Sequence, residues 1–224
     1  MAAAQVVVFT FSFSHHGQFS SYHRLARYLP DCTAIDSSLR LPGWLPQRLA
    51  NSLRYRWQRA SEWRLRRHFL RNSPTCIHYL YPENSLFHGV RWKGAHKLVL
   101  SCHQPASYLI QMAAQANNPF IRGLALADCI VLLTRSSIAE YQHFAPRAKI
   151  EVIPHGVDTH FFYPDPPVQK RKMIITVGNW LRDYTCWAKV VGLALRIDPE
   201  VEFAVVANQT TLDRTLEQIG RAHV

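Results

Sequence analysis

Short apolar runs alternate with amphipathic stretches along this chain, and that alternation constrains the possible fold more than any other feature of the sequence. Apolar runs suited to buried strands lie at 5–13, 33–35, 76–81, 97–102, 128–133 and 150–154. Helical spacing of apolar residues separates them, most clearly at 20–29, 46–70 and 136–144. Strands that alternate with helices indicate a parallel sheet. The sequence therefore predicts an α/β fold with a Rossmann-like parallel sheet.

A proline-rich, charged stretch between Tyr163 and Lys172 is typical of a linker between domains. After it the pattern restarts, with strands predicted at 173–177 and 202–207 and helices at 185–195 and 211–219. Two such units bury too little surface to form a stable domain alone. We therefore predict a first domain at 1–164, a linker at 165–172 and an incomplete second Rossmann-like domain at 173–224. We also expect the chain to be truncated.

Positive charge is concentrated in the first predicted domain. The chain has 26 Lys+Arg against 15 Asp+Glu, a formal net charge of +11. Between residues 40 and 71, nine arginines accompany a single acid, Glu62. Like charges repel unless something neutralises them, so this segment predicts an anionic partner, although a solvated helix face is the alternative.

The same basic segment is predicted to be an amphipathic helix. Its apolar stripe, at steps of three and four residues, consists of Leu45, Leu49, Leu53, Trp57 and Ala60. The arginines predicted to contact a membrane or another anion are Arg48, Arg54, Arg59, Arg66 and Arg67.

Several classes of protein are excluded by composition and motif. A hydrophobic content of 48% with 18% charged residues is globular, and no apolar run approaches the ~20 residues of a membrane-spanning helix. The five cysteines are widely spaced without a CxxC pair, and no HExxH occurs, so we expect no metal site and no disulfide framework. Ser136 lacks the GxSxG context of a serine hydrolase. A reducing cytosol is the simplest compartment.

Ligands of parallel sheets collect at the carboxyl ends of the strands, which makes the residues following each strand the candidates for a site. These candidates are His15, His16, Gly17, His103, Thr134, Arg135, His155, Asp158, Gly178, Asn179 and Arg182. Each has a structural alternative: Gly17 could serve a turn, His15 and His16 could be solvated, and His103 could cap a strand end. Gly17 is not part of a GxGxxG motif, which argues against a standard dinucleotide site.

The segment 153–164, IPHGVDTHFFYP, resembles the IP-(N/H)-GVD-xx-xF-xP segment of retaining glycosyltransferases with the GT-B fold, of the family 4 type. Other stretches are similar in order along the chain: ADCIVLLT at 127–134, VLSCH at 99–103 and IITVG at 174–178. The resemblance implies two facing Rossmann-like domains, with the acceptor in the first and a nucleotide-sugar donor in the second. It also implies a basic helix on an anionic membrane, and catalysis without a divalent metal or other cofactor.

Carried over by position, the resemblance places Gly17 near the donor phosphates, His103 near the transferred sugar and Gly178 in the donor-phosphate loop. Where the family has an arginine after that glycine, this chain has Asn179; Arg182 or Lys189 could supply the charge. The family's acidic pair would lie beyond Val224, so we expect weak activity or none from this chain.

We therefore predict a cytoplasmic glycosyltransferase that contacts the inner face of the membrane. It would move a sugar from a nucleotide-sugar donor to a glycan or lipid-linked acceptor of the cell envelope. The alternative is a basic membrane- or nucleic-acid-binding adaptor with a vestigial enzyme fold, although nucleic acid is not the expected partner. A methyltransferase or dehydrogenase is disfavoured by the missing GxGxxG.

Overall fold

The computed structural model describes residues 5–12, 22–29, 31–70, 75–163, 171–178, 182–207, 209 and 212–213. It divides the chain into two compact units, Met1–Phe162 and Tyr163–Val224, and each is described by itself. Most of the predicted linker at 165–172 lies outside the described residues, since 165–170 are not described, and its bounds remain predictions.

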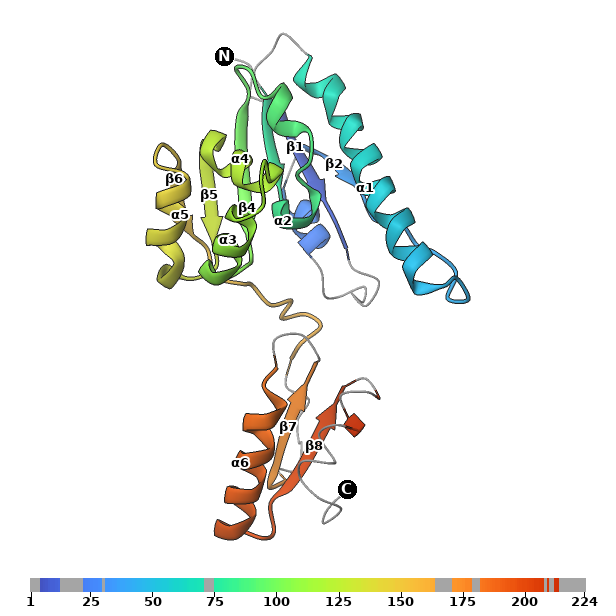
Figure 1. Cartoon of the computed structure of the whole chain (residues 1–224), viewed down its shortest axis with the longest axis vertical. Helices are drawn as coiled ribbons and strands as arrows, with labels where there is room; N and C mark the ends of the chain where they lie inside the picture. Colours follow the sequence, from blue (N-terminus) through green and yellow to red (C-terminus); the bar gives the residue numbers. More distant parts are fainter. Residues whose placement is uncertain are drawn as a thin grey trace. The chain divides into compact units, whose positions relative to one another are not determined.

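The first unit is built on a six-stranded sheet with the order β2-β1-β3-β4-β5-β6 (Figure 1). All five strand pairs are parallel. The strands are β1 (Gln5–Thr10), β2 (Cys32–Asp36), β3 (Thr75–Tyr79), β4 (Lys97–Cys102), β5 (Cys129–Leu132) and β6 (Lys149–Val152). A parallel sheet connected by helices is the predicted Rossmann-like architecture, and the fold class is confirmed.

One layer of helices covers one face of this sheet. The layer contains α1 (Gln47–Phe69), α2 (Pro82–Ser85), η2 (Gly89–Trp92), α3 (Ala106–Ala113), α4 (Pro119–Leu126) and α5 (Ile138–Phe144), preceded by η3 (Arg135–Ser137). Contacts run from α1 to η2, from η2 to α4 and from α4 to both α3 and α5. Right-handed crossovers place η1 (Tyr22–Tyr28) on the other face, against β1 and β2. The sequence predicted an α-helix here; the described turn is a 3₁₀-helix.

The hydrophobic core lies between the sheet and this helical layer. Alternate residues of the strands point into it, including Val7 and Phe9 of β1 and Leu98 and Leu100 of β4, all fully buried. The helices contribute Leu65, Leu109, Leu124 and Tyr141, also fully buried. Because strand side chains alternate between faces, the apolar runs seen in the sequence supply this core directly.

The predicted apolar stripe of α1 is not the face that packs against the sheet. Leu49, Leu53 and Trp57 are 48%, 36% and 44% exposed, and the buried residues of α1 lie mainly in its second half. A 23-residue helix is about 35 Å long, whereas a five-residue strand such as β2 spans about 17 Å. The first half of α1 therefore extends beyond the sheet (Figure 1).

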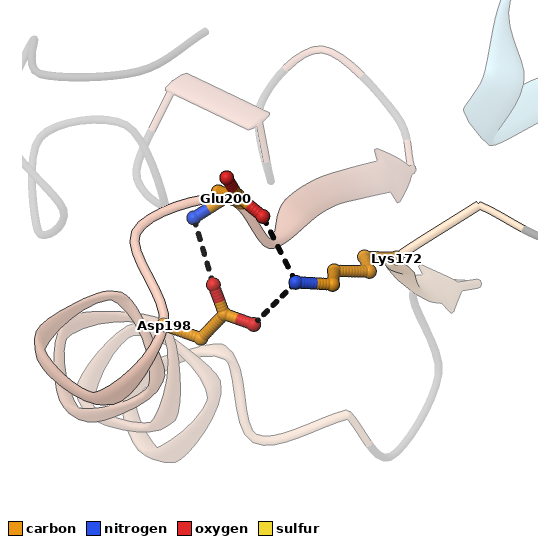
Figure 2. A network of polar contacts seen from close by, with 3 residues as sticks. All are labelled: Lys172, Asp198 and Glu200. Atoms are coloured by element: carbon orange, nitrogen blue, oxygen red, sulfur yellow. Dashed lines mark hydrogen bonds and ion pairs between the residues drawn. The ribbon is translucent and has the colours of Figure 1, made fainter.

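The second unit contains a pair of parallel strands, β7 (Met173–Val177) and β8 (Glu202–Val206), joined by α6 (Tyr184–Ile197). Lys172 Nζ lies 3.2 Å from Asp198 Oδ2 and 2.9 Å from Glu200 Oε2, linking the residue before β7 to the loop before β8 (Figure 2). This βαβ unit contains both predicted strands and the first of the two predicted helices. The predicted helix at 211–219 lies almost entirely outside the described residues.

Within the described parts of the chain, none of the helices combines the length and the apolar character needed to cross a bilayer.

Candidate functional site

The connections of the first sheet reverse direction between β1 and β3. The chain leaves β1 toward β2 on one side, while β3, β4, β5 and β6 follow on the other. Such a switch point opens a crevice at the carboxyl ends of the strands, where ligands of open α/β sheets bind. Tyr81 and Glu83 follow β3, and His103 follows β4, at this edge.

Three aromatic rings from separate segments gather around the ring of His103. Its ring centroid lies 3.8 Å from that of Tyr22, 5.1 Å from Tyr81 and 5.7 Å from His155. Tyr22 belongs to η1, and His155 to the loop after β6. The structure thus brings together two predicted site residues, His103 and His155, with two tyrosines that the sequence analysis did not select.

The protonation state of His103 is set by its surroundings. Its Nε2 lies 2.7 Å from the carbonyl oxygen of Leu80, so Nε2 carries the proton and donates it to that carbonyl. Burial lowers the pKa of His103 to about 4. Its Nδ1 is buried and has no hydrogen-bond partner among the described residues. At neutral pH His103 is therefore a neutral imidazole with a free acceptor nitrogen, suited to accept a hydrogen bond from a hydroxyl group.

Glu83 holds the loop that carries His103. Its Oε1 accepts hydrogen bonds from the backbone N–H groups of His103 and Gln104, the latter at 3.0 Å. Its Oε2 is buried without a hydrogen-bond partner in the described structure. Burial raises the pKa of this carboxyl to about 7, and the two backbone N–H groups oppose the rise. A carboxyl of this kind exchanges its proton near neutral pH.

The next residue, Gln104, is fixed on two further sides. Its Nε2 donates to the hydroxyl of Tyr81 at 2.9 Å, and its carbonyl accepts from the hydroxyl of Tyr141 at 3.0 Å. The loop after β4 is therefore tied to the segment after β3 and to α5, which keeps His103 in a defined position.

A partly buried ion pair joins η1 to the loop after β6. Arg24 Nη2 lies 2.9 Å from Asp158 Oδ2, with 14% and 17% of the two side chains exposed. Asp158 Oδ1 also accepts from the backbone N–H groups of His160 and Phe161, at 3.1 and 3.3 Å. Asp158, predicted as a cleft residue, thus orders its own loop and anchors η1 beside the aromatic rings.

The other candidates of the first unit are not brought into this cluster. Thr134 and Arg135 are exposed after β5, and Thr134 Oγ1 pairs locally with Ser136 Oγ at 2.8 Å. His15, His16 and Gly17 lie outside the described residues.

In the second unit, Gly178 and Arg182 lie together at the carboxyl end of β7. Gly178 has a φ of +102°, which disfavours side chains, and Arg182 Nε donates to the carbonyl of Val177 at 3.1 Å. Arg182 is exposed. Asn179 lies outside the described residues, and Lys189 is exposed on α6.

The arginines predicted to contact an anion all lie on α1. Arg48, Arg59, Arg66 and Arg67 are exposed, whereas Arg54 is half-buried and donates to Asn51 Oδ1 at 3.4 Å. The single acid of this segment, Glu62, is fully buried. Because its acid is buried, the exposed surface of α1 carries more net positive charge than the residue count of the helix indicates.

Sequence reasoning missed Glu83, Tyr81, Tyr22 and Arg24. The rule that found His103 also applies to β3, and the segment Tyr81-Pro82-Glu83 directly after that strand was the available signal. Tyr22 and Arg24 lie in η1, and nothing local distinguishes them from other helix residues.

A search of the described residues finds no group of three His, Cys, Asp or Glu side chains placed to hold a metal ion. The expectation that catalysis needs no metal remains a prediction.

A parallel α/β sheet whose carboxyl edge gathers a neutral histidine, aromatic rings and a buried carboxyl is a ligand-binding domain of the Rossmann-like class. The family model described as Glycosyltransferase Family 4 matches residues 2–161, which include β1 to β6 and the loop with His155 and Asp158. The chain belongs to glycosyltransferase family 4. This supports a general glycosyltransferase function, with a sugar donor and an acceptor as substrates. No curated protein matches the chain.

Proposed function

We propose that this protein transfers a sugar, with retention of configuration, from a nucleotide-sugar donor to a glycan or lipid-linked acceptor. The observation that carries the proposal is the match to family 4 along the whole first sheet, together with His103 at the carboxyl end of β4. The neutral imidazole of His103, with Nδ1 free, is suited to accept a hydrogen bond from a sugar hydroxyl.

The two units would bind different substrates. The first would bind the acceptor between the loops after β4 and β6, where His103 and His155 lie. The second would bind the donor diphosphate at the end of β7, where Gly178 lets the backbone approach a ligand and Arg182 supplies positive charge. Positive side chains there would stabilise the departing nucleoside diphosphate without a metal ion.

We further propose that α1 rests on the anionic inner face of the cytoplasmic membrane. Leu49, Leu53 and Trp57 are exposed on the same helix as Arg48 and four further arginines of the predicted contact. An apolar face flanked by basic residues is typical of helices that lie in the membrane interface. A lipid-linked acceptor would then reach the first unit from this surface.

Calorimetry on the full chain with a panel of nucleoside diphosphates and nucleotide sugars tests the donor. We expect one of them to bind, and Arg182→Gln to weaken that binding about tenfold or more, because a hydrogen bond to a charged group is worth about 1.5–3 kcal/mol. Arg196→Gln, at the far end of α6, is the matched loss of charge and should leave the affinity unchanged. If none of the panel binds, the proposed donor class is wrong.

Co-sedimentation with vesicles tests the membrane contact. The double variant Leu53→Ser, Trp57→Ser should lose binding to vesicles that contain anionic lipid, while Ile110→Ser, at a more exposed apolar residue on α3, should not. Equal binding by the unchanged protein, the double variant and the Ile110 variant would exclude α1 as the contact.

A further inference from the structure

A small cavity lies away from the carboxyl edge, among α1, η2 and the start of α4. Its volume is about 160 Å³, and three of its lining residues are arginines from three different elements. Arg59 comes from α1, Arg91 from η2 and Arg122 from α4, and His88 lies among them. Of these four residues, the sequence analysis selected only Arg59.

The segment that carries His88 and Arg91 is fixed rigidly to α1 by Glu62. The buried carboxylate accepts hydrogen bonds from the backbone N–H groups of Phe87 (3.0 Å), His88 (2.5 Å) and Gly89 (2.8 Å). It also accepts one from the hydroxyl of Tyr79 at 2.8 Å. Arg59 is one helical turn before Glu62, so this network sets the position of Arg91 and His88 relative to Arg59.

The third element, α4, is held against the same segment by close packing. Gly123 lies so near Leu86 that a Cβ at this position would come within 2.2 Å of Leu86 Cδ2. Asn118 caps α4, its Oδ1 accepting from the backbone N–H of Phe120 at 2.9 Å. The backbone that carries Arg122 is therefore held in a defined position beside η2. The three arginines line the cavity in the structure as it stands, so no loop has to move to form it.

Among the described residues, no acid forms an ion pair with these arginines. None of the ion pairs among the described residues includes Arg59, Arg91 or Arg122. The nearest acid in the network, Glu62, already receives four hydrogen bonds from its own surroundings. Three positive side chains thus line one cavity without an ion-pair partner in the described structure. Their mutual repulsion costs free energy, and an anion that binds there relieves it.

We propose that this cavity is a binding site for a phosphate group. A guanidinium presents its N–H donors in a planar fork that matches two oxygens of a phosphate, and several such forks suit a multiply charged tetrahedral anion better than a single carboxylate. His88, at the same cavity, adds a further ring nitrogen. The site is separate from the edge that carries His103, and its existence does not depend on the proposed transferase activity.

The phosphate could belong to a soluble compound or to a lipid headgroup at a membrane touched by α1. Calorimetry of the full chain with inorganic phosphate at low salt tests the first source. Vesicles of phosphatidylcholine with and without phosphatidic acid test the second. The cavity variant is Arg91→Gln, Arg122→Gln, and the matched control is Arg147→Gln, Arg196→Gln, which removes the same charge from exposed positions outside the cavity and outside α1. Circular dichroism checks that both variants are folded.

We expect one phosphate per chain, with the cavity variant binding at least about tenfold more weakly and the control within about twofold of the unchanged protein. Loss of binding to phosphatidic acid vesicles in the cavity variant alone, without binding of free phosphate, would assign the site to a lipid headgroup. Equal weakening in both variants would reveal only general charge attraction and would overturn the proposal. The absence of any binding that depends on the cavity arginines, in both arms, would overturn it as well.

Discussion

Glu83 makes the first unit less stable as the pH rises toward neutral. Burial raises the pKa of its carboxyl from 4.5 to about 7. The folded state therefore holds a proton that the unfolded chain has already lost between these two values. The stabilising contribution is fully present below about pH 4.5 and is lost as the pH rises through about 7. A shift of this size corresponds to roughly 3 kcal/mol of unfolding free energy.

The substitution Glu83→Gln should remove this dependence. The amide is neutral at every pH, and its oxygen can still accept from the backbone N–H groups of His103 and Gln104. We expect the variant to match the unchanged protein near pH 5 and to exceed its stability by up to about 3 kcal/mol near pH 8. The side chains that feel the charge of Glu83 are tyrosines and Cys102, whose pKa values are all raised, so they stay neutral in this range.

Urea unfolding, followed by tryptophan fluorescence at several pH values between 5 and 8, measures the effect. Histidine side chains of the unfolded chain change charge in the same range, so the informative quantity is the difference in stability between the unchanged protein and the variant. Burial lowers the pKa of His78 and His103 to about 4, and their contribution is common to both proteins. Glu151→Gln serves as the matched control, because that side chain is 46% exposed and its ion pair in the described structure is with Lys149. Parallel stability curves for the unchanged protein and Glu83→Gln would refute the argument.

Three further substitutions test contacts that stabilise the first unit. Glu62→Ala leaves four donors without their acceptor, and we expect about 3–5 kcal/mol of lost stability in urea unfolding. Gly123→Ala places a methyl group against Leu86, and a thermal melt should show about 1–3 kcal/mol of destabilisation; an unchanged melt would mean that Leu86 moves aside freely. Asp128→Asn weakens the partly exposed ion pairs with Lys93 and Lys97, and we expect it to lower the unfolding free energy by about 1 kcal/mol at pH 7. The pKa of Asp128 is lowered, despite its partial burial, by hydrogen bonds from Leu98 and the lysines, so this cost should vanish as the pH falls below about 4.

The architecture was predictable because it depends on periodicity. Apolar runs of four to six residues separated by amphipathic stretches fix the strands and helices, and right-handed connections then limit the topologies. The start of α4 has a local signal of the same kind, since Asn118 caps the helix and Pro119 fixes φ at its first position. These signals are local, so a single sequence carries them.

The buried face of α1 was not predictable in the same way. Its apolar stripe extends beyond the sheet, while Gln58, Ser61, Glu62 and His68 are buried in the half that packs. Hydrophobic spacing assigns polar residues to solvent, yet Glu62 is placed inside by four hydrogen bonds to residues 17 to 27 positions away. Only the tertiary structure supplies those donors.

Part of the family resemblance is structural and not catalytic. Asp128, in the stretch at 127–134, lies just before β5, at the amino ends of the strands. Its Oδ2 accepts from the backbone N–H of Leu98 at 2.9 Å, and its own N–H donates to the carbonyl of that residue at 2.9 Å. The motif thus sets the register of β4 and β5 and lies at the opposite edge from His103. A motif can identify a family through residues that do not touch the substrate.

The two buried acids of the first unit explain how its surface becomes so basic. The carboxyl oxygens of Glu62 accept hydrogen bonds from backbone N–H groups at residues 87–89, and those of Glu83 accept from residues 103–104. Neither forms an ion pair with a described arginine or lysine. Acids that position loops cannot also neutralise surface arginines, so the arginines of α1, η2 and α4 keep their charge available for an anion. The two acids that hold the site and the cavity in place therefore leave the positive charge of these elements uncompensated.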